Sequence, residues 1–192
     1  MNGMKKKSGA VFLDRDGTIN EEVGYLDSLD KLKIFPAAFD AVRVINKLGL
    51  KVVVVTNQSG VARGFFDEAF VKTVHKHIDK TFRSRGAFVD RFYYCPHHPT
   101  EGIGRYRMAC RCRKPHPGML LQASAELDID LSTSYVIGDT GRDMELANRT
   151  GARGILVKTG YGKEVISSEI RKAYIADDIL DAAYWILEDR KR

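Results

Sequence analysis

The sequence has no long hydrophobic run. None of its apolar segments approaches the ~20 residues that a helix needs to cross a bilayer. Residues 1–7 are basic but lead into a short strand-like segment, and no apolar signal region follows them. Internal repeats and low-complexity segments are also missing. We therefore expect a cytoplasmic protein with no membrane partner, built as a single domain over residues 1–192.

Cysteine is scarce as well, and its number argues against disulfides. The chain has three cysteines, an odd count, and all three fall between positions 95 and 112. A disulfide framework is typical of small secreted domains, so it is a poor explanation for a chain of 192 residues without an apolar leader. Their crowding indicates a metal site instead.

Acidic charge does not balance basic charge, and the formal net charge is +6. A solvated basic face, an anionic small-molecule substrate and a nucleic acid would each account for this excess. The basic residues are scattered, with one local concentration at Arg105, Arg107, Arg111, Arg113 and Lys114. That distribution suits a phosphate pocket better than a stripe that follows a duplex.

Short apolar runs alternate with amphipathic stretches along the chain. Strands are predicted at residues 10–13, 52–55, 92–94, 135–137 and 154–157. Helices are predicted around residues 39–48, 70–82, 119–127, 144–147 and 179–187, with Asp67 as an N-cap and Gly49 as a stop. This alternation predicts a doubly wound α/β fold, in which ligands bind at the carboxyl ends of the strands.

Two carboxylates follow the first predicted strand in the segment Asp14-Arg-Asp-Gly-Thr18. Like charges this close repel each other unless a cation or a proton lies between them. A hard cation such as Mg²⁺ prefers oxygen ligands and would relieve the repulsion. The alternative is a β-turn with two solvated acids.

Other chemistry-bearing residues follow later strands and loops in the same way. Thr56 comes directly after the second strand, and Lys114 lies near the end of the irregular stretch 95–118. Asp139 ends the fourth strand, and Asp143 lies four residues further on. Each residue taken alone could be explained as a strand end, a loop lysine or a helix-capping acid. Their common placement after strands and loops favours one shared site.

These four motifs resemble those of the haloacid dehalogenase superfamily of phosphatases. The match runs from Asp14-x-Asp16-Gly-Thr18 through Thr56 and Lys114 to Gly138-Asp139-x-x-x-Asp143 and spans about residues 10–160. The resemblance implies a Rossmann-like, mainly parallel sheet with helices on both faces and no large cap domain. It also implies a mechanism that passes through an aspartyl phosphate.

The resemblance assigns roles to these residues. Asp14 is the expected nucleophile, and Asp16 the expected general acid and then base. Mg²⁺ is expected to bind Asp14, the backbone carbonyl of Asp16, and Asp139. Phosphoryl oxygens would accept hydrogen bonds from Thr56 and Lys114, with the backbone around Asn57 assisting, and Asp143 would support the site.

The cysteines form a second motif, Cys95-Pro-His97 and Cys110-Arg-Cys112. Three thiols and one imidazole are a ligand set that zinc favours, which predicts a zinc-stapled loop over about residues 95–112. Three free thiols are the alternative, and His98 is an alternative ligand to His97. A structural zinc would hold Arg113 and Lys114 beside the phosphate pocket.

The loop over about residues 95–112, here called the cysteine loop, narrows the resemblance to one branch of the superfamily. That branch contains heptose-bisphosphate and histidinol-phosphate phosphatases. The resemblance implies removal of the C7 phosphate of D-glycero-D-manno-heptose 1,7-bisphosphate, with histidinol phosphate as the alternative substrate. Arg113 with the Arg63 region is expected to bind the second phosphate. The implied substrate-binding residues are Glu22, Val23, Gly24, Tyr25, Thr56, Asn57, Gln58, Ser59, Arg113 and Lys114.

The expected partner is therefore a small phosphorylated sugar, bound by a monomer. A non-enzymatic, zinc-stabilised nucleic-acid binder is the remote alternative, although four acidic motif residues would repel phosphates there. His75 and His77, in the second predicted helix, are interpreted as surface residues.

Overall fold

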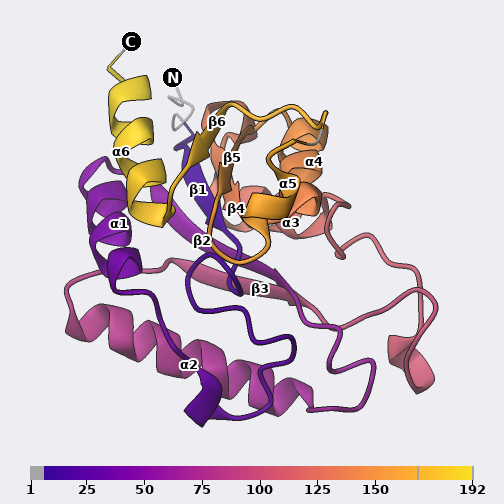
Figure 1. The fold of residues 1–192 in the computed structure, drawn as a ribbon. Helices are drawn as coiled ribbons and strands as arrows, with labels where there is room; N and C mark the ends of the chain where they lie inside the picture. The colour runs from indigo at the N-terminus through magenta and orange to yellow at the C-terminus, as the bar shows by residue number, and fades with distance from the viewer. Residues whose placement is uncertain (1–6, 168, 192) are drawn as a thin grey trace, which may run out of the picture.

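Six parallel strands form one sheet in the order β3-β2-β1-β4-β5-β6 in the computed structural model, which describes residues 7–167 and 169–191 (Figure 1). The strands are β1 (Ala10–Leu13), β2 (Lys51–Asn57), β3 (Arg91–Cys95), β4 (Tyr135–Gly138), β5 (Arg153–Val157) and β6 (Tyr174–Ala176). The basic N-terminal residues 1–6 lie outside the described part of the chain.

Helices pack on both faces of this sheet, and the strands explain why. Successive residues of a strand point to opposite faces, so Val52 and Val54 join one buried cluster while Val53 and Val55 join the other. The first cluster also contains residues of α1 (Pro36–Lys47), α2 (Glu68–Ser84) and α6 (Ile179–Asp189). The second contains residues of α3 (Gly118–Leu127) and α4 (Gly141–Thr150). The predicted doubly wound fold is confirmed.

Helix ends follow the local sequence signals. The Asp67 side chain accepts a hydrogen bond from the Phe70 amide at 2.8 Å, which makes Asp67 the N-cap of α2 as predicted. Helix α1 ends ahead of Gly49, whose φ of 70° a residue with a side chain adopts only at a cost. The short helix α5 (Gly162–Val165) follows β5. No helix within residues 7–167 or 169–191 has the length and apolar character of a membrane span.

One strand was missed from the sequence, and one expectation is wrong. The edge strand β6 was not predicted, because three residues are too few to show a periodic pattern. The surface interpretation of His75 is wrong: only 7% of this residue is exposed, because its ring stacks on Phe92 at a centroid distance of 5.0 Å. His77 is exposed, as expected.

The sheet has its topological switch point between β1 and β4. Chain connections leave these adjacent strands in opposite directions, since β2 lies on one side of β1 and β5 lies beyond β4. The Asp14 amide donates to the carbonyl oxygen of Ile137 at 2.9 Å, which holds the ends of the two strands level. A crevice at the carboxyl ends of such strands is where α/β sheets bind ligands.

Candidate active site

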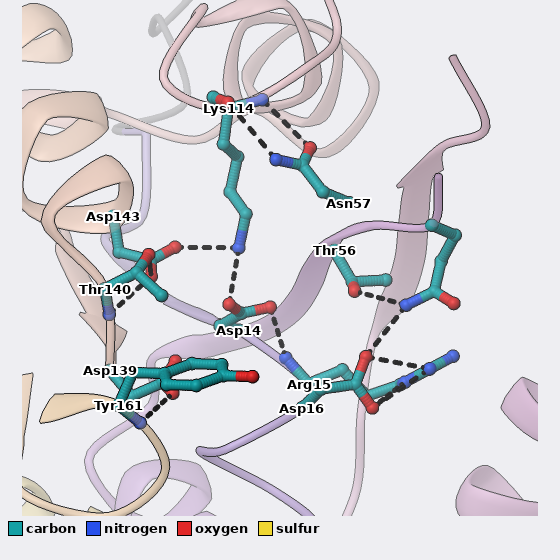
Figure 2. Close-up of polar contacts among 11 residues, drawn as sticks. Asp14, Arg15, Asp16, Thr56, Asn57, Lys114, Asp139, Thr140, Asp143 and Tyr161 are labelled. Atoms are coloured by element: carbon teal, nitrogen blue, oxygen red, sulfur yellow. Dashed lines mark hydrogen bonds and ion pairs between the residues drawn. The ribbon is translucent and has the colours of Figure 1, made fainter. Parts of the chain in front are cut away.

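Asp14 occupies the centre of this crevice, directly after β1. Its Oδ1 accepts a hydrogen bond from the Arg15 amide at 2.6 Å, and its Oδ2 lies 2.8 Å from Nζ of Lys114 (Figure 2). Burial raises the pKa of the Asp14 carboxyl well above its usual value. Lys114 opposes that shift, while Asp143 and Asp139 add to it.

Lys114 reaches the same point from the far end of the irregular loop. Its buried Nζ lies 2.7 Å from Oδ1 of Asp143, in addition to its contact with Asp14. The other oxygen of Asp143, Oδ2, accepts a hydrogen bond from the Thr140 amide at 3.1 Å and so caps α4. Both Asp143 oxygens are thus engaged by the chain itself, which fits a supporting role.

Asp139 follows β4 and faces Asp14 across the crevice. Its Oδ2 accepts a hydrogen bond from the Tyr161 amide at 2.9 Å, whereas its buried Oδ1 has no partner among the described residues. Burial raises the pKa of Asp139 to about 7, against the effect of the Tyr161 amide. The carboxylate fits closely between two glycines, because a Cβ on either Gly17 or Gly160 would overlap it.

This cluster suits a divalent cation. Oxygen atoms of Asp14, Asp139 and Asp143 lie within 4.8 Å of one another, and Lys114 supplies the only positive charge in contact with them among the described residues. An unpartnered buried oxygen on Asp139 and two carboxyls with raised pKa are the features that a hard cation with oxygen ligands would satisfy. The residues present therefore fit Mg²⁺.

Asp16 is held by a different set of donors. Arg15 forms a two-pronged ion pair with its carboxylate, with Nη2 2.8 Å from Oδ2 and Nε 3.1 Å from Oδ1. The side-chain amides of Asn20 and Gln58 each donate at 2.9 Å. Burial alone would raise the pKa of Asp16, but Arg15 and these hydrogen bonds outweigh it and the pKa lies below its usual value.

The end of β2 supplies the next group of side chains. Gln58 Nε2 also donates to Oγ1 of Thr56 at 2.8 Å, so one amide joins Thr56 to Asp16. The side chain of Asn57 instead forms hydrogen bonds with the backbone of Lys114. Its Oδ1 accepts from the Lys114 amide at 3.0 Å, and its Nδ2 donates to the Lys114 carbonyl at 3.2 Å. The side chain of Asn57 therefore positions Lys114.

These residues border a cavity of about 600 Å³, a size typical of small-molecule sites. Most of the predicted substrate-binding residues line it: Glu22, Gly24, Tyr25, Thr56, Asn57, Gln58, Ser59 and Lys114. Val23 and Arg113 are not part of this lining within the described chain. Val23 is exposed beside the cavity, and Nη1 of Arg113 donates to the His97 carbonyl at 3.1 Å.

Several residues of the site were missed from the sequence. Arg15 and Asn20 lie within or next to the first motif, and their contacts with Asp16 depend on how that turn folds. Tyr161 lies outside the four motifs and Arg142 occupies an unspecified position within the fourth, yet both line the cavity. The segment Gly160-Tyr-Gly162 offered a signal, because closely spaced glycines often mark a backbone that approaches another group closely.

The cysteine loop brings its four predicted ligands together. The Sγ atoms of Cys95, Cys110 and Cys112 and Nδ1 of His97 lie within 4.8 Å of one another, and five of the six distances among them are 3.2–3.7 Å. Ligand atoms around a tetrahedral zinc are ~3.5–3.8 Å apart, given the usual Zn–S and Zn–N bond lengths. Hydrogen bonding with Cys95 first, and then with Cys110 and His97, lowers the pKa of the Cys112 thiol to about 5. The cluster fits one metal ion.

The alternative ligand His98 points elsewhere. Its Nδ1 accepts a hydrogen bond from the Glu101 amide at 3.0 Å, within the turn that follows the first two ligands. The loop between the two ligand pairs contains only a short 3₁₀ turn (Gly104–Tyr106) and an isolated bridge between His98 and Arg107. Regular structure contributes little to holding this loop.

Comparison with known proteins places this fold and site in a family. A HAD-hydrolase-like family model matches residues 111–182. The crystal structure of D,D-heptose 1,7-bisphosphate phosphatase from B. bronchiseptica, complexed with magnesium and phosphate, is similar with a TM-score of 0.84. It is 31% identical in sequence, and the similarity covers 94% of this chain and 99% of that one. The chain belongs to the haloacid dehalogenase-like hydrolases.

Curated relatives narrow the class further. A protein from Escherichia coli strain K12 named D-glycero-beta-D-manno-heptose-1,7-bisphosphate 7-phosphatase is 46% identical over 159 residues, covering 82% of this chain and 83% of that one. A protein of the same name from Pasteurella multocida strain Pm70 is 44% identical over 182 residues, covering 93% and 95%. The chain is a phosphatase, and the prediction made from its four motifs is confirmed.

Proposed function

We propose that this phosphatase removes the C7 phosphate of D-glycero-β-D-manno-heptose 1,7-bisphosphate with the help of Mg²⁺. The observation that carries the proposal is the meeting of Asp14, Lys114 and Asp139 at the switch point of the sheet, with one Asp139 oxygen left unpartnered. The names of the relatives at 44–46% identity supply the substrate.

In the proposed first step, Asp14 attacks the phosphorus atom and the sugar oxygen leaves. Asp14 is ionised when it acts, because Lys114 and a bound cation offset the burial that raises its pKa. Thr56 Oγ1 and Lys114 Nζ donate hydrogen bonds to the phosphoryl oxygens, whose charge shifts as the bond to the sugar breaks. Bound Mg²⁺, held by Asp14, Asp139 and the Asp16 carbonyl, would neutralise charge on the phosphoryl group.

Asp16 acts as the general acid in the first step and as the general base in the second. It donates a proton to the leaving sugar oxygen and then accepts one from the water that cleaves the aspartyl phosphate. The Arg15, Asn20 and Gln58 contacts favour its ionised form and so suit the second step. A bound phosphate dianion beside Asp16 favours its protonated form, as the first step requires.

The cysteine loop completes the proposal as a structural zinc site formed by Cys95, His97, Cys110 and Cys112. The metal would stiffen the loop that leads directly into Arg113 and Lys114, while Asn57 fixes the backbone of Lys114 from the other side. The earlier expectations of one domain with an inserted loop, a monomer, a cytoplasmic location and no nucleic-acid partner remain predictions.

Phosphate release from a small substrate panel tests the function. The panel contains both anomers of heptose 1,7-bisphosphate, histidinol phosphate and fructose 1,6-bisphosphate, each with Mg²⁺ and with EDTA. We expect magnesium-dependent turnover with a strong preference for the β-heptose bisphosphate. A preference for histidinol phosphate would keep the chemistry but reject this substrate, and no magnesium-dependent turnover would reject both.

A further inference from the structure

Three cationic side chains line the cavity, and they differ in what they contact. Arg15 is paired with Asp16, and Lys114 is paired with Asp14 and Asp143 at 2.7–2.8 Å. Arg142 lies in the first turn of α4 and is exposed, and its side chain forms no ion pair or hydrogen bond with another described residue. Among the described residues that border the cavity, Arg142 is thus the cationic side chain without a partner.

The acids that border the same cavity do not neutralise Arg142. Glu145, one turn further along α4, is paired with Arg149, and Glu22 accepts a hydrogen bond from the Gly24 amide at 2.5 Å. Both acids would repel a phosphate, so a second anionic group of a substrate is drawn to Arg142 and away from them.

The two arginines expected to bind the second phosphate are less suited to it than Arg142. Among the described residues Arg113 is not part of the cavity lining, and its Nη1 donates to the His97 carbonyl at 3.1 Å. Arg63 is itself neutralised, because it forms an ion pair with Glu101. The second-phosphate site expected at Arg113 and Arg63 therefore shifts toward Arg142, where the unpaired charge borders the cavity.

We propose that Arg142 binds the phosphate that this enzyme retains on its substrate, the one at C1 of the heptose. The inference rests on the proposed function, since it needs a bisphosphate. The transferred phosphate belongs beside Asp14, Thr56 and Lys114, which are buried, whereas Arg142 is exposed at the mouth of the cavity. A guanidinium can donate two parallel hydrogen bonds to one phosphate, which suits it to this task.

The test compares two substrates that differ only in the retained phosphate, heptose 1,7-bisphosphate and heptose 7-phosphate. In the Arg142→Gln variant we expect kcat/KM for the bisphosphate to fall roughly 10- to 100-fold, as for a lost hydrogen bond to a charged group. We expect kcat/KM for heptose 7-phosphate to stay within about twofold of wild type, because that substrate has nothing for Arg142 to bind. Arg142→Lys should recover part of the loss.

Arg91→Gln is the matched control. It makes the same change of charge at an exposed position at the amino end of the edge strand β3, whereas the cavity lies at the carboxyl ends of the strands, and it should behave as wild type with both substrates. The product heptose 1-phosphate keeps the group in question, so Arg142→Gln should weaken its inhibition by a similar factor. An equal loss on both substrates, or no loss on the bisphosphate, would overturn the proposal.

Failure of the Arg142 proposal can be told apart from failure of the proposed heptose substrate. If wild type prefers fructose 1,6-bisphosphate, the heptose assignment fails, and the same comparison is made with fructose 1,6-bisphosphate and fructose 6-phosphate. Loss confined to the bisphosphate then still supports Arg142. A wild-type enzyme that hydrolyses mono- and bisphosphates equally well contradicts the role of Arg142.

Discussion

Nζ of Lys114 lies 2.7 Å from Oδ1 of Asp143, and both side chains are almost completely withdrawn from solvent. An ion pair in such surroundings stabilises the fold only while both partners are present, because a lone buried charge has no solvent to compensate it. The same lysine contacts Asp14, so one side chain holds together the nucleophile and the support of the site.

Replacing Lys114 by Met should therefore cost both stability and activity. We expect the free energy of unfolding of the metal-free protein to fall by roughly 3–5 kcal/mol, the usual result of breaking a buried pair. Urea denaturation measures this loss. Lys158→Met, which breaks the exposed pair with Asp177, should cost under ~1 kcal/mol. The double variant Lys114→Met/Asp143→Asn should recover part of the lost stability but no activity. A Lys114→Met variant as stable as wild type would contradict this account.

His75 should make stability depend on pH. Burial, assisted by Arg15, lowers its pKa to about 3 in the folded protein, against ~6.5 when unfolded. Between these values the unfolded chain binds a proton that the folded chain does not, so this stability is present above pH ~6.5 and is lost as pH falls. From pH 7 to pH 5, wild type should lose ~2 kcal/mol more than His75→Phe.

The exposed neighbour supplies the control for that experiment. His77→Phe lies on the same helix and should keep the wild-type dependence of unfolding free energy on pH. Parallel curves for wild type and His75→Phe would show that His75 titrates normally. The Phe ring preserves the stacking on Phe92 and leaves no unpartnered ring nitrogen.

Gly160 should be essential because of its close approach to Asp139. A Cβ there would overlap Oδ2 of Asp139 and lie 2.7 Å from the Gly17 Cα, so Gly160→Ala should displace Asp139 and remove most magnesium-dependent activity. Gly151→Ala has a similar positive φ of 74° but open space around the added methyl group. It should cost ~1 kcal/mol of stability and leave kcat unchanged. Equal activity in the two variants would contradict the tight packing around Asp139.

Zinc removal should affect binding more than chemistry. We expect one zinc per chain by elemental analysis, and its loss in the Cys110→Ser variant. The loosened loop should raise KM more than it lowers kcat, while the magnesium concentration for half-maximal activity stays near that of wild type, because the acidic cluster lies on other elements. Zinc-free protein with full activity would contradict this role.

The sequence revealed those parts of the molecule that have local patterns. The apolar run Val52–Val55 predicted a central strand, and Asp14 and Asp139 were recognised because each follows an apolar run. The contact of Arg15 with Asp16 could not be predicted because it depends on how one turn folds, and that of Asn57 with Lys114 because it joins segments far apart in the sequence. Arg142 escaped notice because an exposed arginine on a helix looks ordinary until its neighbours are known.

The stereochemical course at phosphorus tests the central claim, an aspartyl phosphate on Asp14, most directly. Each in-line displacement inverts the phosphoryl group, so transfer to Asp14 followed by attack of water inverts it twice. With a substrate whose phosphoryl group is chiral through oxygen isotopes and sulfur, we predict retention of configuration in the released thiophosphate. Inversion would mean that water attacks the substrate in one step, and it would contradict a covalent intermediate on Asp14.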